Sequence, residues 1–146
     1  MKEVIVDLDG TLANIEHRLE YVKRKSPDWD SFYAACKNDV PNEWCVDLMR
    51  SLCASGIIVN IVSARRDSER FTTLKWLDKY DIPFNQLLML RKGSDNTPDV
   101  ELKQDWLNGY GKKSIIFVVD DRQRVVDMWR RNGLVCLQAY AWEEYK

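Results

Sequence analysis

The sequence lacks a long apolar run and a strong excess of charge of either sign. Nothing in its 146 residues approaches the roughly 20 consecutive apolar residues that a membrane-spanning helix needs. Two carboxylates, Asp7 and Asp9, interrupt the early apolar run, so we expect no secretory leader and no membrane partner. Because the formal net charge is −1, a nucleic-acid partner would have to bind a local basic patch rather than a strongly basic surface.

Common cysteine and glycine motifs are absent as well. The four cysteines, Cys36, Cys45, Cys53 and Cys136, form no CxxC pair and have none of the spacings of a zinc site. We interpret them as reduced, mostly buried thiols of a cytoplasmic protein. The nucleotide-binding pattern GxxxxGK[ST] does not occur, because GYGKKS at residues 109–114 lacks the spacing that lets backbone amides bind phosphates. We therefore expect no kinase domain.

Short β-rich runs alternate with helix-like stretches along most of the chain. The apolar runs lie at residues 3–8, 57–62, 87–90, 115–119 and 134–138. The spacing of apolar residues predicts helices over residues 42–55, 67–80, 99–109 and 122–132. Strands that are apolar throughout and alternate with helices favour a three-layer α/β fold, in which helices cover both faces of a central parallel sheet. The length and composition suit a single domain over residues 1–146.

Residues 14–41 break this alternation. The segment is polar and aromatic, and a break near Ser26 divides it into two short helices. We expect it to form a small helical cap, inserted after the first strand, over one edge of the sheet. Trp29, Phe32 and Tyr33 are interpreted as the core of this cap, with stacking on nucleic-acid bases as the alternative.

Polar side chains collect where three of the predicted strands end. They are Asp7 after the first strand, Ser63 after the second, and Asp120 and Asp121 after the run at residues 115–119. The carboxyl ends of parallel strands share one edge of the sheet, where ligands bind in folds of this class. The gathered oxygen atoms and the excess of negative charge predict a hard divalent cation, and Mg²⁺ fits such a site better than zinc does.

These residue types suit phosphoryl transfer. Once a cation screens Asp7, its carboxylate can attack phosphorus and form an aspartyl-phosphate. Asp9 could then act as general acid and base, and we expect the neighbouring carboxylates to raise its pKa. Ser63 can donate a hydrogen bond to a phosphoryl oxygen, and Lys103 can stabilise the charge of the transferring group. Gly10 lets the chain turn away tightly after the two carboxylates.

Four motifs in this order resemble those of the haloacid dehalogenase (HAD) phosphohydrolases. They are DLDGT at residues 7–11, Ser63 after an apolar strand, Lys103 opening a helix, and VVDD at 118–121. A closer similarity is to the 3′-phosphatase domain of the T-even phage polynucleotide kinase-phosphatases. It is carried by VSARR at 62–66, RKGSDNTPDVELK at 91–103 and VVDDRQRVVDMWRRNGLVCLQ at 118–138. This resemblance implies a Mg²⁺-dependent enzyme that removes 3′-phosphates from DNA or RNA ends.

The resemblance also implies roles for single residues. The implied catalytic residues are Asp7, Asp9, Ser63, Lys103, Arg65 and Arg18. The implied metal ligands are Asp7, the backbone carbonyl of Asp9, and Asp120, supported by Asp99 and Asp121. The implied phosphate-binding residues are Ser63, Ala64 and Lys103. Thr97 departs from the family pattern, in which we expect a basic residue.

Two other functions stay open. One is a small-molecule phosphatase of the same superfamily, such as a 5′-nucleotidase, which would share every catalytic residue. The other is a non-catalytic module that binds polynucleotide ends. The short cap favours the polynucleotide 3′-phosphatase, because it would leave the site open to a polymer terminus. A separate kinase or ligase is a candidate partner in end repair, and a homodimer is a candidate assembly.

Overall fold

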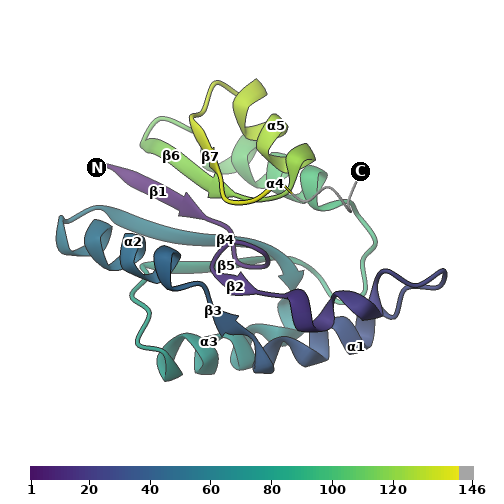
Figure 1. Ribbon diagram of the computed structural model, residues 1–146. Helices are drawn as coiled ribbons and strands as arrows, with labels where there is room; N and C mark the ends of the chain where they lie inside the picture. The colour runs from purple at the N-terminus through teal and green to yellow at the C-terminus, as the bar shows by residue number, and fades with distance from the viewer. Residues whose placement is uncertain (142–146) are drawn as a thin grey trace.

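The computed structural model describes residues 1–141 and places a parallel sheet between two layers of helices (Figure 1). Within these residues the sheet has five strands in the order β5-β4-β1-β6-β7, all parallel. The strands are β1 (Glu3–Val6), β4 (Ile58–Arg66), β5 (Gln86–Arg91), β6 (Ile115–Asp120) and β7 (Cys136–Gln138). The predicted α/β class with a central parallel sheet is confirmed.

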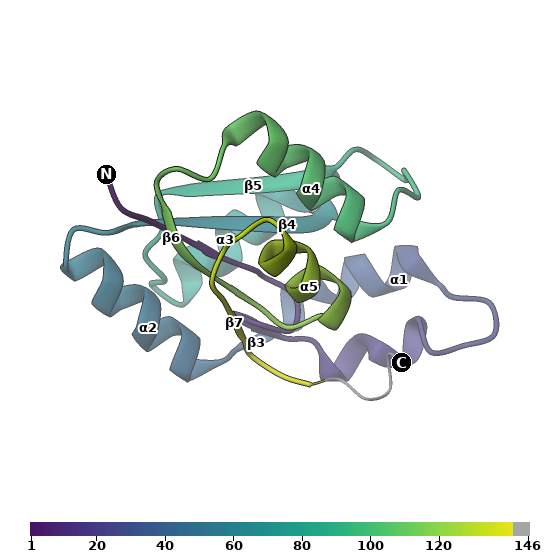
Figure 2. The ribbon, with the colours of Figure 1, turned by 90° about the horizontal axis from the view of Figure 1, so that it is seen from above.

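The two faces of the sheet pack against different pairs of helices. On one face lie α2 (Glu43–Ala54) and α3 (Arg70–Lys79), and on the other lie α4 (Asp99–Tyr110) and α5 (Gln123–Arg131) (Figures 1 and 2). Successive side chains of a strand point to opposite faces. Val4 and Val6 therefore pack in the α2–α3 core, whereas Ile5 packs in the α4–α5 core. Burial on both faces explains why these strands are apolar throughout.

One strand is longer than the sequence indicated. We predicted that the second apolar run would end at Val62, but β4 continues to Arg66. The pairing of β4 with β5 shifts in register between Ser63 and Arg66, so this polar end of the strand is irregular but still paired. The prediction was wrong because the apolar run ends at Val62, whereas the buried polar residues Ser63 and Arg65 continue the strand. The helix expected from residue 67 starts instead with a 3₁₀ turn, η3 (Asp67–Glu69).

The segment at residues 14–41 lies beyond the carboxyl ends of the strands (Figure 2). Its helical parts are η1 (Glu16–Tyr21), α1 (Trp29–Ala34) and η2 (Ala35–Asn38). The sequence did not indicate the two short strands at its ends, β2 (Ala13–Asn14) and β3 (Val40–Pro41), which pair antiparallel. This ribbon brings the start and the end of the segment together. We call the segment the cap.

No helix within residues 1–141 combines the length and the apolar character needed to cross a membrane. The cysteines are free: Cys36, Cys45 and Cys136 are buried, and Cys53 is half-buried. Burial raises the pKa of Cys36 to about 11 and the pKa values of Cys45 and Cys136 to about 12. The interpretation as reduced, mostly buried thiols agrees with this arrangement.

We predict that an alkylating reagent at neutral pH modifies Cys53 before the other three cysteines. The thiolate is the reactive form, and Cys36, Cys45 and Cys136 are both inaccessible and held protonated. Peptide mass spectrometry after a brief treatment with iodoacetamide measures the order of labelling. Protein unfolded in urea is the control, in which all four thiols react. Labelling of Cys45 ahead of Cys53 in the folded protein would contradict the burial described above.

Candidate active site

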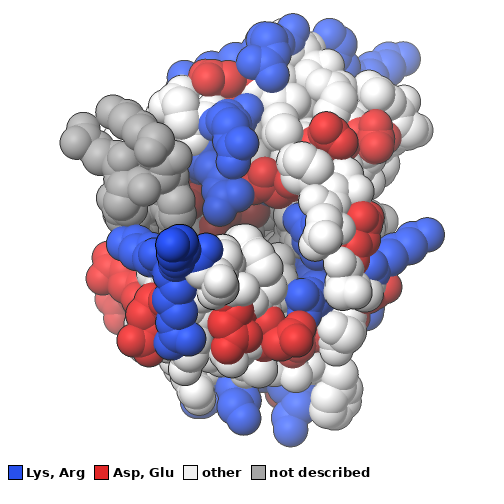
Figure 3. Space-filling view, turned by 90° about the vertical axis from the view of Figure 1, so that its right-hand side faces the viewer, with Lys and Arg blue, Asp and Glu red and all other residues white. Residues whose placement is uncertain are grey.

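A pocket of about 450 Å³ opens between the carboxyl edge of the sheet and the cap. Its polar lining includes Asp7 after β1, Ser63 on β4, Asp120 at the end of β6 and Lys103 on α4. Four separate elements thus bring their predicted residues into one cavity. The space-filling view shows acidic surface recessed in a hollow with basic side chains around it (Figure 3).

Three buried carboxylates form the floor of this pocket. Asp7, Asp120 and Asp121 each offer an oxygen atom, and these atoms lie within 4.8 Å of one another. The Nζ atom of Lys103 donates to Asp7 Oδ1 at 2.8 Å and to Asp120 Oδ2 at 2.9 Å. Burial and then the neighbouring Asp120 carboxylate raise the pKa of Asp7 well above its ordinary value, although Lys103 opposes them.

Lys103 contacts two of the three carboxylates, Asp7 and Asp120. Burial alone would lower the pKa of Lys103, but Asp120 and Asp7 outweigh it and raise that pKa, so the lysine is cationic. The remaining negative charge and the all-oxygen donor set suit a hard divalent cation such as Mg²⁺. Asp7, Asp120 and Asp121 are the residues of the described chain that could hold it.

Two side chains that the sequence analysis did not single out orient these carboxylates. Thr11 Oγ1 lies 3.3 Å from Asp7 Oδ2 and 3.2 Å from Asp121 Oδ1, within hydrogen-bond reach of both. The indole nitrogen of Trp129, on α5, donates to Asp120 Oδ2 at 3.0 Å. Thr11 belongs to the DLDGT motif and could have been found there. Trp129 belongs to the stretch at 118–138 that carries the family similarity, but its helical spacing indicated only a core residue.

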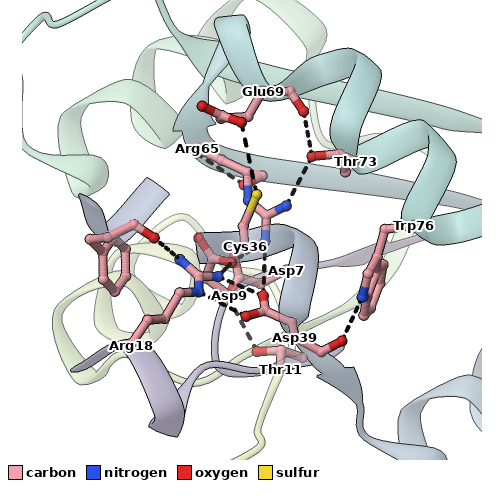
Figure 4. Close-up of polar contacts among 12 residues, drawn as sticks. Asp7, Asp9, Thr11, Arg18, Cys36, Asp39, Arg65, Glu69, Thr73 and Trp76 are labelled. Atoms are coloured by element: carbon pink, nitrogen blue, oxygen red, sulfur yellow. Dashed lines mark hydrogen bonds and ion pairs between the residues drawn. The ribbon is translucent and has the colours of Figure 1, made fainter. Parts of the chain in front are cut away.

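Asp9 lies apart from the three carboxylates, between two arginines (Figure 4). The Arg18 guanidinium donates to Asp9 Oδ1 at 2.6 Å, and Arg65 donates to the same oxygen. Burial alone would raise the pKa of Asp9, but Arg18 and Arg65 outweigh it and lower that pKa below its ordinary value. The expected rise was therefore wrong, because the nearest groups to Asp9 are guanidinium groups rather than carboxylates.

A further carboxylate, Asp39, supports both arginines and was missed by the sequence analysis. Arg18 donates to the two oxygens of Asp39 at 2.8 and 2.7 Å, and Arg65 lies 3.5 Å from one of them. The Nε2 atom of His17 is 2.6 Å from the other. Asp39 follows η2 in a stretch without any motif, so only the folded contacts reveal it.

The two arginines differ in how they meet the pocket. Arg65 lines it, and its backbone N–H donates to Ser63 Oγ at 3.0 Å, which leaves the serine hydroxyl hydrogen available for a ligand. Arg18 does not line the pocket. Its side chain is fully buried behind Asp9, with the guanidinium 4.4 Å from the ring centroid of Phe32. The structure therefore places Arg18 as a support for Asp9 rather than on the pocket wall.

Asp99 and Ala64 also line the pocket. Asp99 opens α4, where its Oδ1 accepts a hydrogen bond from the backbone N–H of Val100 at 2.9 Å. Its Oδ2 accepts one from Arg122 at 2.7 Å. Asp99 is not part of the three-carboxylate group, and its hydrogen bond with Arg122 links it to the residue that follows Asp121. Thr97, where we expected a basic residue, bonds to Asp95.

Gly10 has a positive φ of +86° and lies against Asp121. A Cβ atom at this position would be 2.1 Å from Asp121 Oδ2, which is closer than any real contact. Only glycine allows both this backbone conformation and this approach. The position of Asp121 therefore depends on the absence of a side chain at residue 10.

An aspartate follows the central strand of a parallel sheet, a lysine holds it, and further carboxylates lie at the same edge, as the resemblance to the HAD phosphohydrolases implied. The sequence profile of the family described as the polynucleotide kinase PNKP phosphatase domain matches residues 1–142. The chain belongs to this family, as the motifs indicated.

Similar proteins include longer chains. A protein of Autographa californica nuclear polyhedrosis virus, named for polynucleotide kinase and RNA ligase activities, is 33% identical over 131 residues, which are 88% of this chain and 18% of the viral one. A chain of the solved Pnkp1/Rnl/Hen1 RNA repair complex is 32% identical with a TM-score of 0.83, over 97% of this chain and 43% of that one. This chain thus spans less than half the length of these relatives.

A more distant structure shows the fold alone. It is a HAD family enzyme from Bacteroides thetaiotaomicron, solved in complex with magnesium and inorganic phosphate. It is 16% identical with a TM-score of 0.60, over 99% of this chain and 98% of that one.

We predict that Gly10→Ala removes phosphatase activity through displacement of Asp121, not through backbone strain alone. Gly56→Ala is the matched control, because Gly56 has a similar φ of +80° and open space around its Cβ position. Each substitution should lower the free energy of unfolding by about 1 kcal/mol for the left-handed conformation. Only Gly10→Ala should lose hydrolysis of a simple phosphomonoester. Equal activity in both variants would contradict the assigned contact.

We also predict that Asp39→Asn destabilises the protein. Breaking a buried ion pair leaves an uncompensated charge, which costs about 3 kcal/mol of unfolding free energy. Asp30→Asn is the control, because Asp30 pairs with Arg66 at the surface and should matter little. Urea denaturation followed by circular dichroism compares the two variants. A loss for Asp39→Asn no larger than that for Asp30→Asn would show that Asp39 is not needed to balance the arginines.

Proposed function

We propose that the chain is a Mg²⁺-dependent phosphomonoesterase that removes 3′-phosphates from DNA or RNA ends through an aspartyl-phosphate. The observation that carries this proposal is the family match over residues 1–142, which includes the cap as well as the catalytic strands. Phosphatases of this fold share their catalytic residues, so their substrates differ through what surrounds the site. A match that includes the surroundings therefore supports the substrate as well as the chemistry.

Asp7, Asp120 and the backbone carbonyl of Asp9 would hold the metal ion, with Asp121 beside them. When bound, Mg²⁺ supplies positive charge that screens the carboxylates from an anionic phosphate. This role fits the three-carboxylate floor, whose oxygens lie within 4.8 Å of one another. Lys103 would donate to the phosphoryl oxygens from the same side, since it already reaches both Asp7 and Asp120.

The reaction then has two steps on the side chains of this chain. In the first, a carboxylate oxygen of Asp7 bonds to phosphorus and the bond from phosphorus to the 3′-oxygen breaks. Asp9, which would take up a proton from solvent when the substrate binds, gives that proton to the 3′-oxygen. In the second, Asp9 takes a proton from water, the water oxygen bonds to phosphorus, and the bond to Asp7 breaks. Inorganic phosphate and a 3′-hydroxyl end are the products.

The phosphate would also change the contacts of Asp9. Ser63, Ala64 and Arg65 line the pocket, so an entering phosphoryl group can accept hydrogen bonds from this end of β4. Arg65 would then donate to the phosphate instead of to Asp9, while Arg18 would keep its contacts with Asp9 and Asp39. This exchange frees Asp9 to carry a proton when the substrate is bound.

The names of the relatives support a role in end repair. One is named for polynucleotide kinase and RNA ligase activities, and another belongs to an RNA repair complex. We infer that a kinase and a ligase, on a longer chain or on separate ones, act on the ends that this phosphatase produces. A 3′-hydroxyl end is the kind of end that a ligase joins.

We predict that the protein releases inorganic phosphate from a 3′-phosphorylated oligonucleotide in Mg²⁺ and not in EDTA. The same oligonucleotide with a 5′-phosphate is the matched control and should be a poor substrate. Asp7→Asn should be inactive while circular dichroism shows it folded, and Lys103→Ala should lose at least about 100-fold in turnover. Faster turnover of nucleoside 5′-monophosphates than of the 3′-phosphorylated strand would reject the proposal in favour of a 5′-nucleotidase.

A further inference from the structure

We infer that Trp29 of the cap is a stacking surface for the base of the nucleotide whose phosphate is hydrolysed. The inference rests on the proposed function and deepens it, because it names what holds the substrate beyond its phosphate. It concerns a residue that the sequence analysis interpreted as part of the core of the cap.

The pocket is larger and less polar than a phosphate requires. Its volume of about 450 Å³ falls within the range of roughly 300–1,000 Å³ that accommodates a small organic molecule. The catalytic carboxylates, Ser63 and Lys103 occupy one part of its lining. Most of the apolar lining comes from the cap, which contributes Ile15, Leu19, Val22, Trp29, Phe32 and Tyr33. The cavity therefore suits a phosphate attached to a flat, largely apolar group.

Among the cap aromatics, Trp29 alone keeps a large exposed surface. Trp29 is 41% exposed, whereas Phe32 and Tyr33 are 6% and 7% exposed. The interpretation as a core therefore fits Phe32 and Tyr33 but not Trp29. The indole stacks on Tyr33 at 6.1 Å between ring centroids with 30° between planes, and it meets Phe32 edge-on at 5.6 Å. Two buried rings thus pack against the indole, which is partly exposed and lines the pocket.

The helix that carries Trp29 is fixed to both the cap and the sheet. Asp28 accepts a hydrogen bond from the backbone N–H of Ser31 at 3.0 Å, which caps α1. From β4, Arg66 lies over the Tyr33 ring at 4.8 Å to its centroid and pairs with Asp30. Because Arg66 is on the same strand as Ser63, these contacts link the aromatic surface to the phosphate-binding end. A surface held in place before binding loses little entropy when it binds.

Stacking suits an enzyme that acts on ends of any sequence. Every nucleobase has a flat face, so an aromatic side chain holds all four without reading hydrogen bonds. Further cations at the same pocket, Arg66, Arg91 and Arg124, could attract the next phosphates of a strand. The chemistry of the pocket therefore matches a nucleoside phosphate at the end of a polyanion.

The experiment compares substrates with and without a terminal base. One is a 3′-phosphorylated oligonucleotide, and the other has the same sequence with a tetrahydrofuran abasic residue under the phosphate. They are tested with the natural protein and with Trp29→Ala and Trp29→Phe. Trp44→Ala is the matched control, because Trp44 is 42% exposed on α2 and does not line the pocket. Thermal unfolding checks that each variant is folded.

We expect Trp29→Ala to raise KM for the base-bearing substrate by roughly 5- to 100-fold with little change in kcat. Trp29→Phe should recover part of this loss, and Trp44→Ala should behave as the natural protein. For the abasic substrate, the KM of the natural protein should already be as high as that of Trp29→Ala for the base-bearing substrate. Trp29→Ala should not raise the KM for the abasic substrate further. Equal KM values of the natural protein for the two substrates would overturn the inference. An equal rise in KM for both substrates in Trp29→Ala would overturn it as well.

The design separates this inference from the proposed function. If 3′-phosphorylated ends are not hydrolysed but mononucleotides are, the proposed function fails. The KM values of the natural and Trp29→Ala proteins are then compared for a nucleoside 5′-monophosphate, which has a base, and for ribose 5-phosphate, which has none. Equilibrium titration of Asp7→Asn protein with the two oligonucleotides gives a further comparison that needs no turnover. Equal affinities there would also overturn the stacking surface.

Discussion

Mutual repulsion among three buried carboxylates governs the architecture of this site. Asp7 and Asp120 meet because β1 and β6 are neighbours in the sheet, and Asp121 follows directly along the chain. Such a group is costly to bury unless positive charge accompanies it. Lys103 reaches in from α4 to supply part of that charge, and the glycine at residue 10 gives Asp121 its space. The sheet order, the helix and the turn together hold three carboxylates close enough for a bound cation to contact all of them.

The site is divided into two halves of different electrostatic character. The floor has an excess of negative charge, whereas the half beside the cap is balanced, with two arginines between two carboxylates. Asp9 belongs to the balanced half although it is only two residues from Asp7. The tight turn at Gly10 follows, and the chain enters the cap, where Arg18 and Asp39 reside. Two neighbouring aspartates thus acquire opposite pKa shifts, because burial and the Asp120 carboxylate dominate at Asp7, whereas Arg18 and Arg65 outweigh burial at Asp9.

The features that sequence alone could predict are local ones. Apolar runs and helical spacing located the strands and helices, and strand ends located Asp7, Ser63 and Asp120 in one pocket. The features that the sequence could not predict depend on contacts between segments that are distant along the chain. Arg18 pairs with Asp39, which lies 21 residues further along the chain. The β2–β3 ribbon pairs residues at either end of the cap. The exposure of Trp29 depends on which rings pack behind it. The pKa of Asp9 was mispredicted for the same reason, because the deciding neighbours come from the cap and β4.

The β2–β3 ribbon has a consequence for how such a protein can change over time. Since Ala13–Asn14 and Val40–Pro41 pair with each other, the intervening residues leave and rejoin the main body at nearly one point. An insertion or a deletion between β2 and β3 would leave the register of the five-stranded sheet unchanged, because the two paired strands would stay where they are. Selection could thus change the aromatic residues of the cap while Asp7, Lys103 and Asp120 stay in place on the sheet and α4. The cap is not wholly independent of the site, because it also carries Arg18 and Asp39, which support Asp9.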